Sequence, residues 1–293
     1  MDMSFRPTGV TPIHLSDIRT GRSFREAADA YIKSGGEQRY LPPIIDYFGD
    51  RPLASIYPAD IREMAEVIYP LAKGSTRNRQ AVTPARAVLM WGYDKGWCGL
   101  IRVRRFKTDK PKRLKAASPL WMHDFTRQCD RDVLPHLAAI VMFMAQTGAR
   151  ISEAVALRWS EVDLNARTAL LLKTKTSTNS VRYITDGLVG RLRDLRVDQS
   201  ADDRVFRYTS RHSVNERIKA VCERAGIENK PPHTCGRRTF ATRAIDLGMD
   251  VRTAMTAGGW ESSSVFLEIY VQPRVNAGRM VADRFALDDV ANA

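Results

Sequence analysis

Apolar residues recur with helical spacing through the first hundred residues of the chain. Ser23 and Glu26 have the spacing of a capping box and open an amphipathic segment. A second helix is predicted to begin at Pro58, and a third to cover about 75–90, where Pro84 could kink it. The pattern therefore predicts a small helical domain.

From Ser118 onward the pattern is different. Residues 133–146 are apolar almost all round, which is typical of a buried helix. Two short β-rich runs on either side of TSTNS predict an antiparallel hairpin. Further helices are expected after a second capping box at Ser213 and up to Gly248, the residue type that commonly follows a helix end. The predicted fold class is mainly α with a small antiparallel β-sheet.

Between these two patterns the composition changes. The run IRVRRFKTDKPKRLKA holds eight Lys or Arg and one Asp, and it has no amphipathic period. Such a run is usually a solvated linker that charge repulsion keeps extended, and it could also follow a phosphate backbone. We therefore predict a short tail at 1–20, a helical domain at 21–103, a basic linker at 104–117 and a second domain at 118–293.

The charge balance favours a polyanionic partner. Lys and Arg total 46 against 33 acidic residues, which gives a formal net charge of +13 and an isoelectric point near 9.8. Neutralising phosphates releases condensed counterions and so drives binding to nucleic acid. A merely solvated basic surface is the ordinary alternative.

The apolar runs and the cysteines indicate a cytoplasmic protein. The longest apolar run, residues 137–145, is too short to cross a bilayer, and the first ten residues contain no signal-peptide core. The cysteines have no CxxC pairing and no partner histidines, so we expect reduced, mostly buried thiols and no metal site. They are Cys98, Cys129, Cys222 and Cys235.

The segment TGARISEAVALRW places a charge where packing alone does not explain it. Arg150 directly follows the predicted buried helix, an unusual position for an arginine unless an anion meets it. Glu153 lies three positions further on, so at a helix start it could orient the guanidinium. Taken alone, this is a surface ion pair of little energetic value.

Two later segments combine cations with aromatic residues. In PPHTCGRRTFAT, His233 and Arg237 lie four positions apart and face the same way if helical geometry extends back across the intervening glycine. In GGWESSSVFLEIY, Trp260 and Tyr270 end a short amphipathic stretch. Taken alone, such residues are usually capping groups and core aromatics.

In their order and spacing the three segments together resemble the tyrosine recombinase (phage integrase) family. TGARISEAVALRW resembles the family's first arginine box, RRTFAT its second, and GGW…Y its nucleophile box. The resemblance is strong over about 118–273 and weaker over 20–105. It implies a helical, SAM-like core-binding domain, a mixed α/β catalytic domain and a C-terminal helix.

The resemblance implies a role for each matched residue. Tyr270 would be the nucleophile, and Arg150 and Arg237 would grip the scissile phosphate, with Glu153 as a helper carboxylate. Two guanidiniums suit this role because each can donate parallel hydrogen bonds to phosphate oxygens and stays charged. Protonated tyrosine is a poor nucleophile, so a cationic surrounding that stabilises the phenolate would activate it.

The remaining roles fall on a histidine, a tryptophan and a lysine. His233 would relay the nucleophile's proton, and Trp260 stands where the family usually has His. The general acid would be a lysine on the hairpin, for which Lys175 is preferred and Lys173 is the alternative.

Two spacings differ from the family's usual pattern. The histidine lies four residues before Arg237 rather than three, and the glycine before the arginine could absorb the extra residue. The stretch from Trp260 to Tyr270 is also one residue longer than is common.

The resemblance implies a site-specific recombinase that forms a 3′-phosphotyrosine without metal or ATP, so no cofactor is expected. The implied partners are double-stranded DNA and three further copies in a synaptic tetramer, and the free protein could be a monomer. A prophage or mobile-element role is favoured; a Xer-like resolvase, a type IB topoisomerase and a catalytically silent DNA-binding protein are the alternatives. DNA contacts are expected from basic residues of the third helix and the linker: Arg77, Arg79, Arg86, Arg104, Arg105, Lys107, Lys112 and Arg113.

Overall fold

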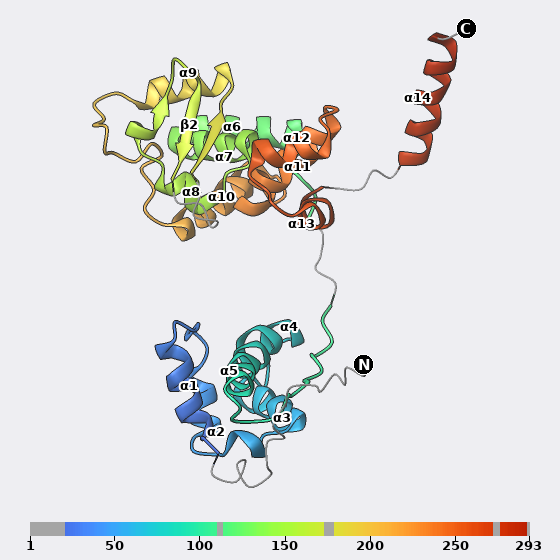
Figure 1. Cartoon of the computed structure of the whole chain (residues 1–293). Helices are drawn as coiled ribbons and strands as arrows, with labels where there is room; N and C mark the ends of the chain where they lie inside the picture. The colour runs from blue at the N-terminus through green and yellow to red at the C-terminus, as the bar shows by residue number, and fades with distance from the viewer. Residues whose placement is uncertain (1–20, 110–113, 173–178, 272–275, 292–293) are drawn as a thin grey trace, which may run out of the picture. The chain divides into compact units, whose positions relative to one another are not determined.

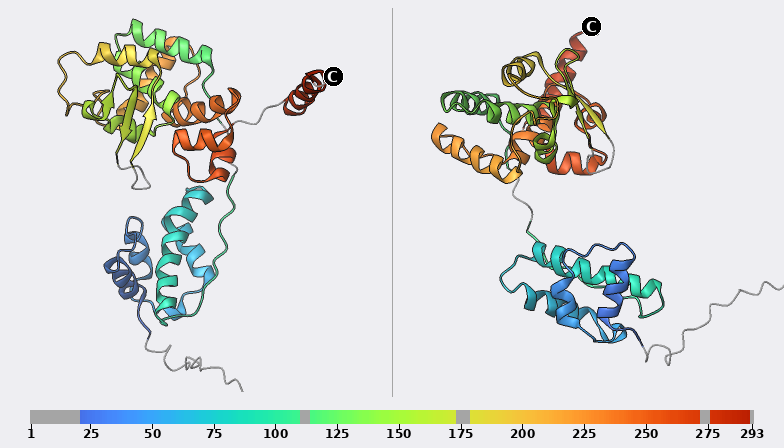
Figure 2. Two further views of the ribbon diagram at one scale, coloured as in Figure 1. Left: turned by 45° about the horizontal axis from the view of Figure 1, so that its top comes forward. Right: turned by 90° about the vertical axis from the view of Figure 1, so that its left-hand side faces the viewer.

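Two separate hydrophobic cores divide the chain into two units (Figures 1 and 2). The computed structural model describes residues 21–109, 114–172, 179–271 and 276–291. Contacts divide the chain into residues 1–111 and 112–293. The described part is mostly helical, with one three-stranded antiparallel sheet in the second unit, as the sequence pattern predicts.

The first unit is built from helices. The capping box at Ser23 is confirmed, because its hydroxyl accepts from the Glu26 backbone and the Glu26 carboxylate accepts from the Ser23 backbone. The pattern did not predict α2, which begins with two prolines at positions where a helix tolerates them. The elements are α1 (Phe24–Lys33), α2 (Pro42–Phe48), η1 (Leu53–Ser55), α3 (Pro58–Ile68), α4 (Gly74–Arg77), η2 (Asn78–Val82) and α5 (Thr83–Asp94).

A π turn lies where the sequence predicts a kink. Segments α4, η2 and α5 follow one another without a break, and the Thr83 backbone donates to Asn78, five residues back. Pro84 at the start of α5 has no N–H to donate, and the turn before it is wider than an α turn. The proline is therefore accommodated without ending the helix.

The basic segment after α5 is held at both of its described ends. In the first unit, Ile101 and Val103 enter the core, and both polar atoms of the Asn78 side chain bond the backbone of Phe106 at 2.8 and 2.9 Å. Residues 114–117 belong to the second unit and are bound there. The predicted linker is thus attached at either side of residues 110–113, which lie outside the described residues.

Buried polar groups hold the end of this segment in the second unit. Lys230, 5% exposed, donates to the carbonyl of Lys115 at 3.0 Å. The Thr239 hydroxyl accepts from the Ala117 backbone at 2.9 Å and donates to the carbonyl of Thr234 at 2.9 Å. The segment is therefore hydrogen-bonded to Thr239 at the start of α11, and through Thr239 to the first carbonyl of η4.

The second unit is arranged around α7, which is buried on nearly every side. It packs against α6, α8, α9, α10, α11 and η4. The helix begins at Pro135 rather than at the predicted Val133, because Val133 has a positive φ of 54° and proline fits the first helical position. The helical elements are α6 (Pro119–Arg131), α7 (Pro135–Thr147), α8 (Ile151–Ala156), η3 (Trp159–Glu161), α9 (Asp186–Leu195), α10 (Arg211–Ala225), η4 (Thr234–Arg238), α11 (Thr239–Asp246), α12 (Val251–Gly258), α13 (Ser263–Val265), η5 (Phe266–Tyr270) and α14 (Ala277–Ala291).

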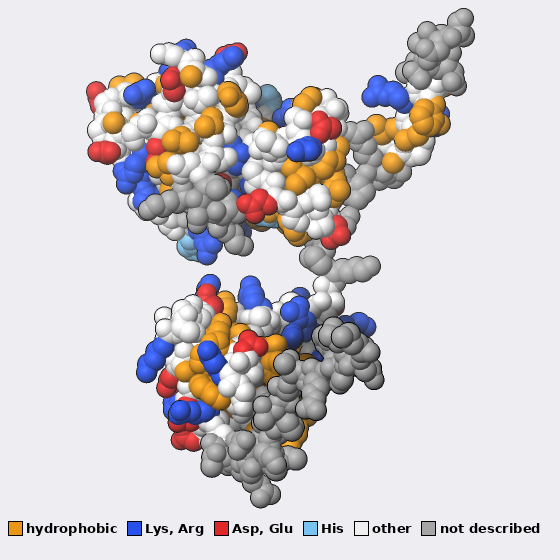
Figure 3. Space-filling view, viewed as in Figure 1, with side chains coloured by type: hydrophobic (Ala, Val, Ile, Leu, Met, Phe, Trp, Pro, Cys, Tyr) orange, Lys and Arg blue, Asp and Glu red, His pale blue; other side chains and the backbone are white. Residues whose placement is uncertain are grey.

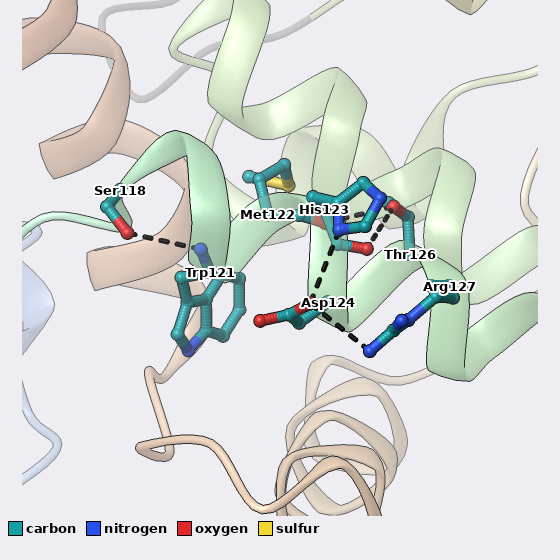
Figure 4. Close-up of polar contacts among 7 residues, drawn as sticks. All are labelled: Ser118, Trp121, Met122, His123, Asp124, Thr126 and Arg127. Carbon is teal, nitrogen blue, oxygen red and sulfur yellow. Dashed lines mark hydrogen bonds and ion pairs between the residues drawn. The ribbon is translucent and has the colours of Figure 1, made fainter.

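Helix α6 opens the second unit with a side-chain cap (Figure 4). The Ser118 hydroxyl accepts from the backbone of Trp121 at 3.1 Å. One turn further on, the Asp124 carboxylate lies 3.3 Å from His123 and 3.4 Å from Arg127. Trp121 of the same helix enters the core of the second unit.

The predicted hairpin is confirmed. Strands β2 (Thr168–Leu171) and β3 (Ser180–Tyr183) are antiparallel, and β1 (Val162–Asp163) completes the order β1-β2-β3. The candidate lysines Lys173 and Lys175 lie between β2 and β3, outside the described residues.

One predicted helix start is wrong. Ser213 lies inside α10, and its hydroxyl donates to the Ser210 carbonyl at 2.8 Å. Ser210 is the actual cap, because its backbone is extended and its hydroxyl accepts from His212. The predicted end at Gly248 is confirmed, since this glycine follows α11 with a φ of +90°.

Two further expectations concern membrane spans and thiols. Over the residues that the structure describes, no helix combines the length and apolarity that a membrane crossing requires. The four cysteines are unpaired and buried, and burial raises the pKa of the Cys129 thiol to about 12.

Replacing Gly148 by Ala should destabilise the protein by about 2–4 kcal/mol, because the residue ends α7 with a φ of +69° and a Cβ there would lie 3.0 Å from Phe240 and 3.1 Å from Trp260. Urea denaturation measures the change. The matched control is Gly190→Ala within α9, where nothing lies within 4 Å, and it should stabilise by about 0.5–1 kcal/mol. Equal effects of the two substitutions would contradict this account.

Candidate active site

Arg150 is the residue that precedes α8, three positions after the last residue of α7. Its Nη1 donates to Glu153 Oε1 at 2.6 Å, and its backbone donates to Oε2 at 2.7 Å. The Glu153 side chain is nearly buried, whereas that of Arg150 is 32% exposed. One carboxylate therefore orients the guanidinium and leaves part of it accessible, as the three-residue spacing predicts.

Arg237 is buried without a carboxylate partner among the ion pairs of the described residues. Its side chain lies in η4 and is 4% exposed overall, with Nη1 donating to the carbonyls of Gly148 at 2.5 Å and Gly258 at 3.3 Å. Burial and the nearby Arg150 lower the pKa of Arg237 to about 10, so it still carries its charge at neutral pH. Its Nε finds no hydrogen-bond partner within the described parts of the chain.

Aromatic rings surround this guanidinium. The Arg237 Cζ lies 3.7 Å from the centroid of the Trp260 ring and 5.4 Å from that of Tyr270, within the range of cation–π attraction. Trp260 stacks on Phe240 with centroids 5.8 Å apart and meets Phe266 edge-on at 5.1 Å. Trp260 thus fixes one side of Arg237 with its ring face.

Tyr270 meets His233 beside this cluster. The His233 Nε2 and the Tyr270 hydroxyl oxygen are 2.9 Å apart. Partial burial, Arg238 and Arg237 lower the pKa of His233 from its ordinary value of 6.5, so the ring is neutral at neutral pH. In the tautomer with its proton on Nδ1, the Nε2 accepts the phenol hydrogen. The Thr242 hydroxyl also donates to the Tyr270 carbonyl at 3.2 Å, which holds the end of η5.

Two π segments account for the unusual spacings. Helical geometry extends back from Arg237 to His233 through η4, and Tyr270 ends η5. A π turn holds one more residue than an α turn, so the extra residue in each stretch is taken up within the helix. Gly236 allows η4 to approach α7, because a Cβ there would lie 2.8 Å from that of Met144.

The structure brings six of the candidate residues together: Arg150, Glu153, His233, Arg237, Trp260 and Tyr270. Lys173 and Lys175 fall outside the described residues. Arg182 on β3 was not among the predicted site residues, yet it lies close enough to Arg150 and Glu153 for both to affect its pKa. The sequence feature that could have pointed to Arg182 is the presence of a charged residue in the middle of a predicted strand.

The candidate DNA-binding arginines differ in their surroundings. Arg77 donates to the carbonyls of Tyr69 and Pro70 at 3.0 and 2.7 Å, and Arg86 is partly buried. Figure 3 shows Lys and Arg side chains of the first unit gathered along the edge where α4 lies. Arg79, Arg104, Arg105 and Lys107 are exposed, while Lys112 and Arg113 lie outside the described residues.

The sequence is similar to known recombinases and integrases. The model of a family described as the phage integrase family matches residues 124–276. Tyrosine recombinase XerD of Bifidobacterium longum (strain NCC 2705) is 35% identical over 142 residues, which cover 42% of this chain and 46% of the relative. The integrase of Salmonella phage P22 is 24% identical over 193 residues, covering 59% of this chain and 48% of the relative. The chain spans about half the length of these curated relatives.

Solved structures share the fold. The Tn1549 transposon integrase in complex with a circular intermediate DNA gives a TM-score of 0.70 at 14% identity, over 90% of this chain and 99% of that one. A lambda integrase tetramer bound to a Holliday junction gives 0.66 at 14% identity, over 92% and 84% of the two chains. At these identities the likeness establishes the fold, a mainly helical architecture with a small sheet.

The imidazole of His233 should titrate with a midpoint below pH 6.5, because burial and two guanidiniums disfavour its protonation. The folded state then binds this proton less readily than the unfolded chain. The resulting contribution to stability is complete above about pH 6.5 and is lost as the pH falls from there through the folded-state midpoint. An NMR titration checks this, with His233→Gln identifying the resonance, and a midpoint at or above 6.5 would contradict it.

Proposed function

Because the chain belongs to the phage integrase family, we propose that it is a site-specific DNA recombinase that acts through a 3′-phosphotyrosine on Tyr270. The observation that carries the proposal is the position of the Tyr270 hydroxyl, 2.9 Å from His233 and on an aromatic cluster that also seats Arg237. These groups match a nucleophile, a proton acceptor and an anion-binding guanidinium.

In the proposed cleavage step, the Tyr270 oxygen attacks the scissile phosphorus and its proton passes to His233 Nε2. The bond from phosphorus to the 5′ oxygen breaks, so the 3′ phosphate becomes joined to the tyrosine. Arg150 and Arg237 would donate hydrogen bonds to the non-bridging oxygens, where charge increases in the five-coordinate state. Preorganised donors of this kind contribute about 3 kcal/mol each to lowering a barrier.

The leaving 5′ oxygen needs a proton, which we assign to Lys175, with Lys173 as the alternative. In the second step the 5′ hydroxyl of another strand attacks the phosphotyrosine, and Tyr270 leaves as the phenol. The covalent bond to the protein retains the energy of the phosphodiester, so the exchange needs no ATP. The scheme also assigns no role to a metal or other cofactor.

The proposed substrate is double-stranded DNA, and the proposed location is the cytoplasm. The exposed Arg79, Arg104, Arg105 and Lys107 would contact phosphates, to which basic side chains bind with release of counterions. As a domain assignment we propose residues 21–103 for core binding, 104–117 as the linker and 118–293 for catalysis.

We assign the exchange to integration or excision of a prophage or another mobile element. Resolution of replicated DNA is the second candidate, because the relative with 35% identity is a XerD recombinase. A type IB topoisomerase would differ by relaxing supercoiled DNA without a specific site. A silent DNA-binding protein would form no covalent adduct.

Replacing Tyr270 by Phe should reduce formation of a covalent protein–DNA adduct to background, because it removes the oxygen that would bond to phosphorus. The adduct is measured with a nicked suicide half-site, as protein that stays bound to DNA under denaturing conditions. Tyr183→Phe is the matched control, since Tyr183 is 78% exposed on β3 and should leave the yield unchanged. Persistence of the adduct in Tyr270→Phe would refute the assignment of the nucleophile.

The synaptic assembly is proposed to be a tetramer in which α14 docks on a neighbouring copy. This helix exposes apolar side chains, shown in orange in Figure 3, with Met280, Val281 and Phe285 exposed by 38%, 54% and 66%. Exposed apolar surface of this kind is typical of a segment that binds a partner.

Deleting residues 277–291 should abolish strand exchange while leaving binding of a single half-site unchanged. Phe285→Ser should weaken exchange in the same direction, and Asp283→Asn on the same helix is the control expected to leave it near wild type. Gel shifts with one half-site and a two-site recombination assay separate the steps. Unchanged recombination by the deletion variant would rule out the docking role.

A further inference from the structure

On strand β3 the usual burial pattern is inverted, because a charged side chain faces the interior and its apolar neighbours face outward. Arg182 faces the interior and is 2% exposed, while its neighbours Val181 and Tyr183 face outward with 51% and 78% exposure. The strand partner of Arg182 is Ala169, a small buried residue. Burying a charge costs several kcal/mol unless its surroundings compensate, so this position requires an explanation.

The carbonyl end of α12 supplies part of that compensation. Arg182 Nη1 donates to the Ala257 carbonyl at 2.5 Å, and Arg237 Nη1 lies 3.3 Å from the carbonyl of the next residue, Gly258. A helix C-terminus carries partial negative charge, so it attracts both cations. Gly259 has a φ of +65°, and a Cβ there would overlap Arg182 Nη2. The last turn of α12 thus accepts hydrogen bonds from two guanidiniums, and Gly259 leaves room for one of them.

The charge of this group is not balanced. Arg182, Arg237 and Arg150 supply three positive charges. Among the ion pairs of the described residues, only Glu153, paired with Arg150, supplies a negative charge to this group, so the net charge is +2. Burial lowers the pKa of Arg182, and Glu153 and Arg150 act on it in opposite directions. The Nε atoms of Arg182 and Arg237 are buried and have no partner within the described parts of the chain.

We infer that Arg182 is a positioning residue for the phosphate site, and this inference rests on the proposed function. Its guanidinium holds the turn of α12 on which Arg237 is also seated. Its buried charge adds to the positive potential at Arg150 and Arg237. A phosphodiester carries one negative charge and its five-coordinate state carries two. The excess positive charge of the site therefore stabilises the five-coordinate state more than the bound substrate.

The test compares Arg182→Met with Arg182→Lys on two suicide half-sites. One carries the normal scissile phosphate, and the other an uncharged methylphosphonate at that position. On phosphate, Arg182→Met should slow adduct formation by about 10²–10³-fold, because it removes a buried positive charge and displaces the preorganised donor Arg237. Arg182→Lys should recover part of the rate because it restores the charge. On the methylphosphonate the loss relative to wild type should shrink to about 10–30-fold, because its five-coordinate state carries one negative charge where that of the phosphate carries two.

Arg204→Met is the matched control. Arg204 also donates to carbonyls, those of Val155 and Tyr208, but it does not belong to the site. Its replacement should change the rate of adduct formation by the same factor on both substrates. Gly259→Ala is the second variant if Arg182→Met does not fold, because its Cβ would displace Arg182 without removing a polar group, and it should show the same phosphate-selective loss.

The outcomes distinguish a failure of the inference about Arg182 from a failure of the proposed recombinase function. Wild-type rates in Arg182→Met, or an equal loss on both substrates without recovery by Lys, would overturn the role of Arg182 alone. If wild-type protein forms no adduct with either substrate, the proposed function fails and this inference fails with it.

Discussion

The second unit depends on keeping a charged guanidinium buried although, among the described residues, no carboxylate forms an ion pair with it. Arg237 meets this constraint through the carbonyl ends of two helices, at Gly148 and Gly258, and through the face of Trp260. A carboxylate in the same place would neutralise the charge and compete with any phosphate. Carbonyls and an aromatic face stabilise the cation and leave its net charge available.

Much of this arrangement was predictable because local patterns and the tertiary fold agree. The buried helix before Arg150, the hairpin and the helix end at Gly248 each follow from residue types that have one favourable place. The capping box at Ser213 failed for a physical reason. Ser210 competes for the same role and has the extended backbone that a cap requires, so spacing alone could not decide between the two hydroxyls.

Other features were beyond a reading of periodicity. Arg182 occupies the inward position of β3 because the carbonyl end of α12 lies there, and only the tertiary structure brings those segments together. The π segments behave similarly, since no residue type specifies a π turn. A histidine four residues from Arg237 fits the site only once η4 is known to hold an extra residue.

The attachment of the basic segment gives the second unit an unusual mechanical arrangement. Its last residues are not fastened to a remote edge of the unit but to Thr239 and Lys230, and Thr239 in turn bonds the first carbonyl of η4. Any tension along the connecting segment therefore reaches the turn that carries Arg237 after two hydrogen bonds. The part of the protein that would hold the reacting phosphate is thus also the part on which such tension would act.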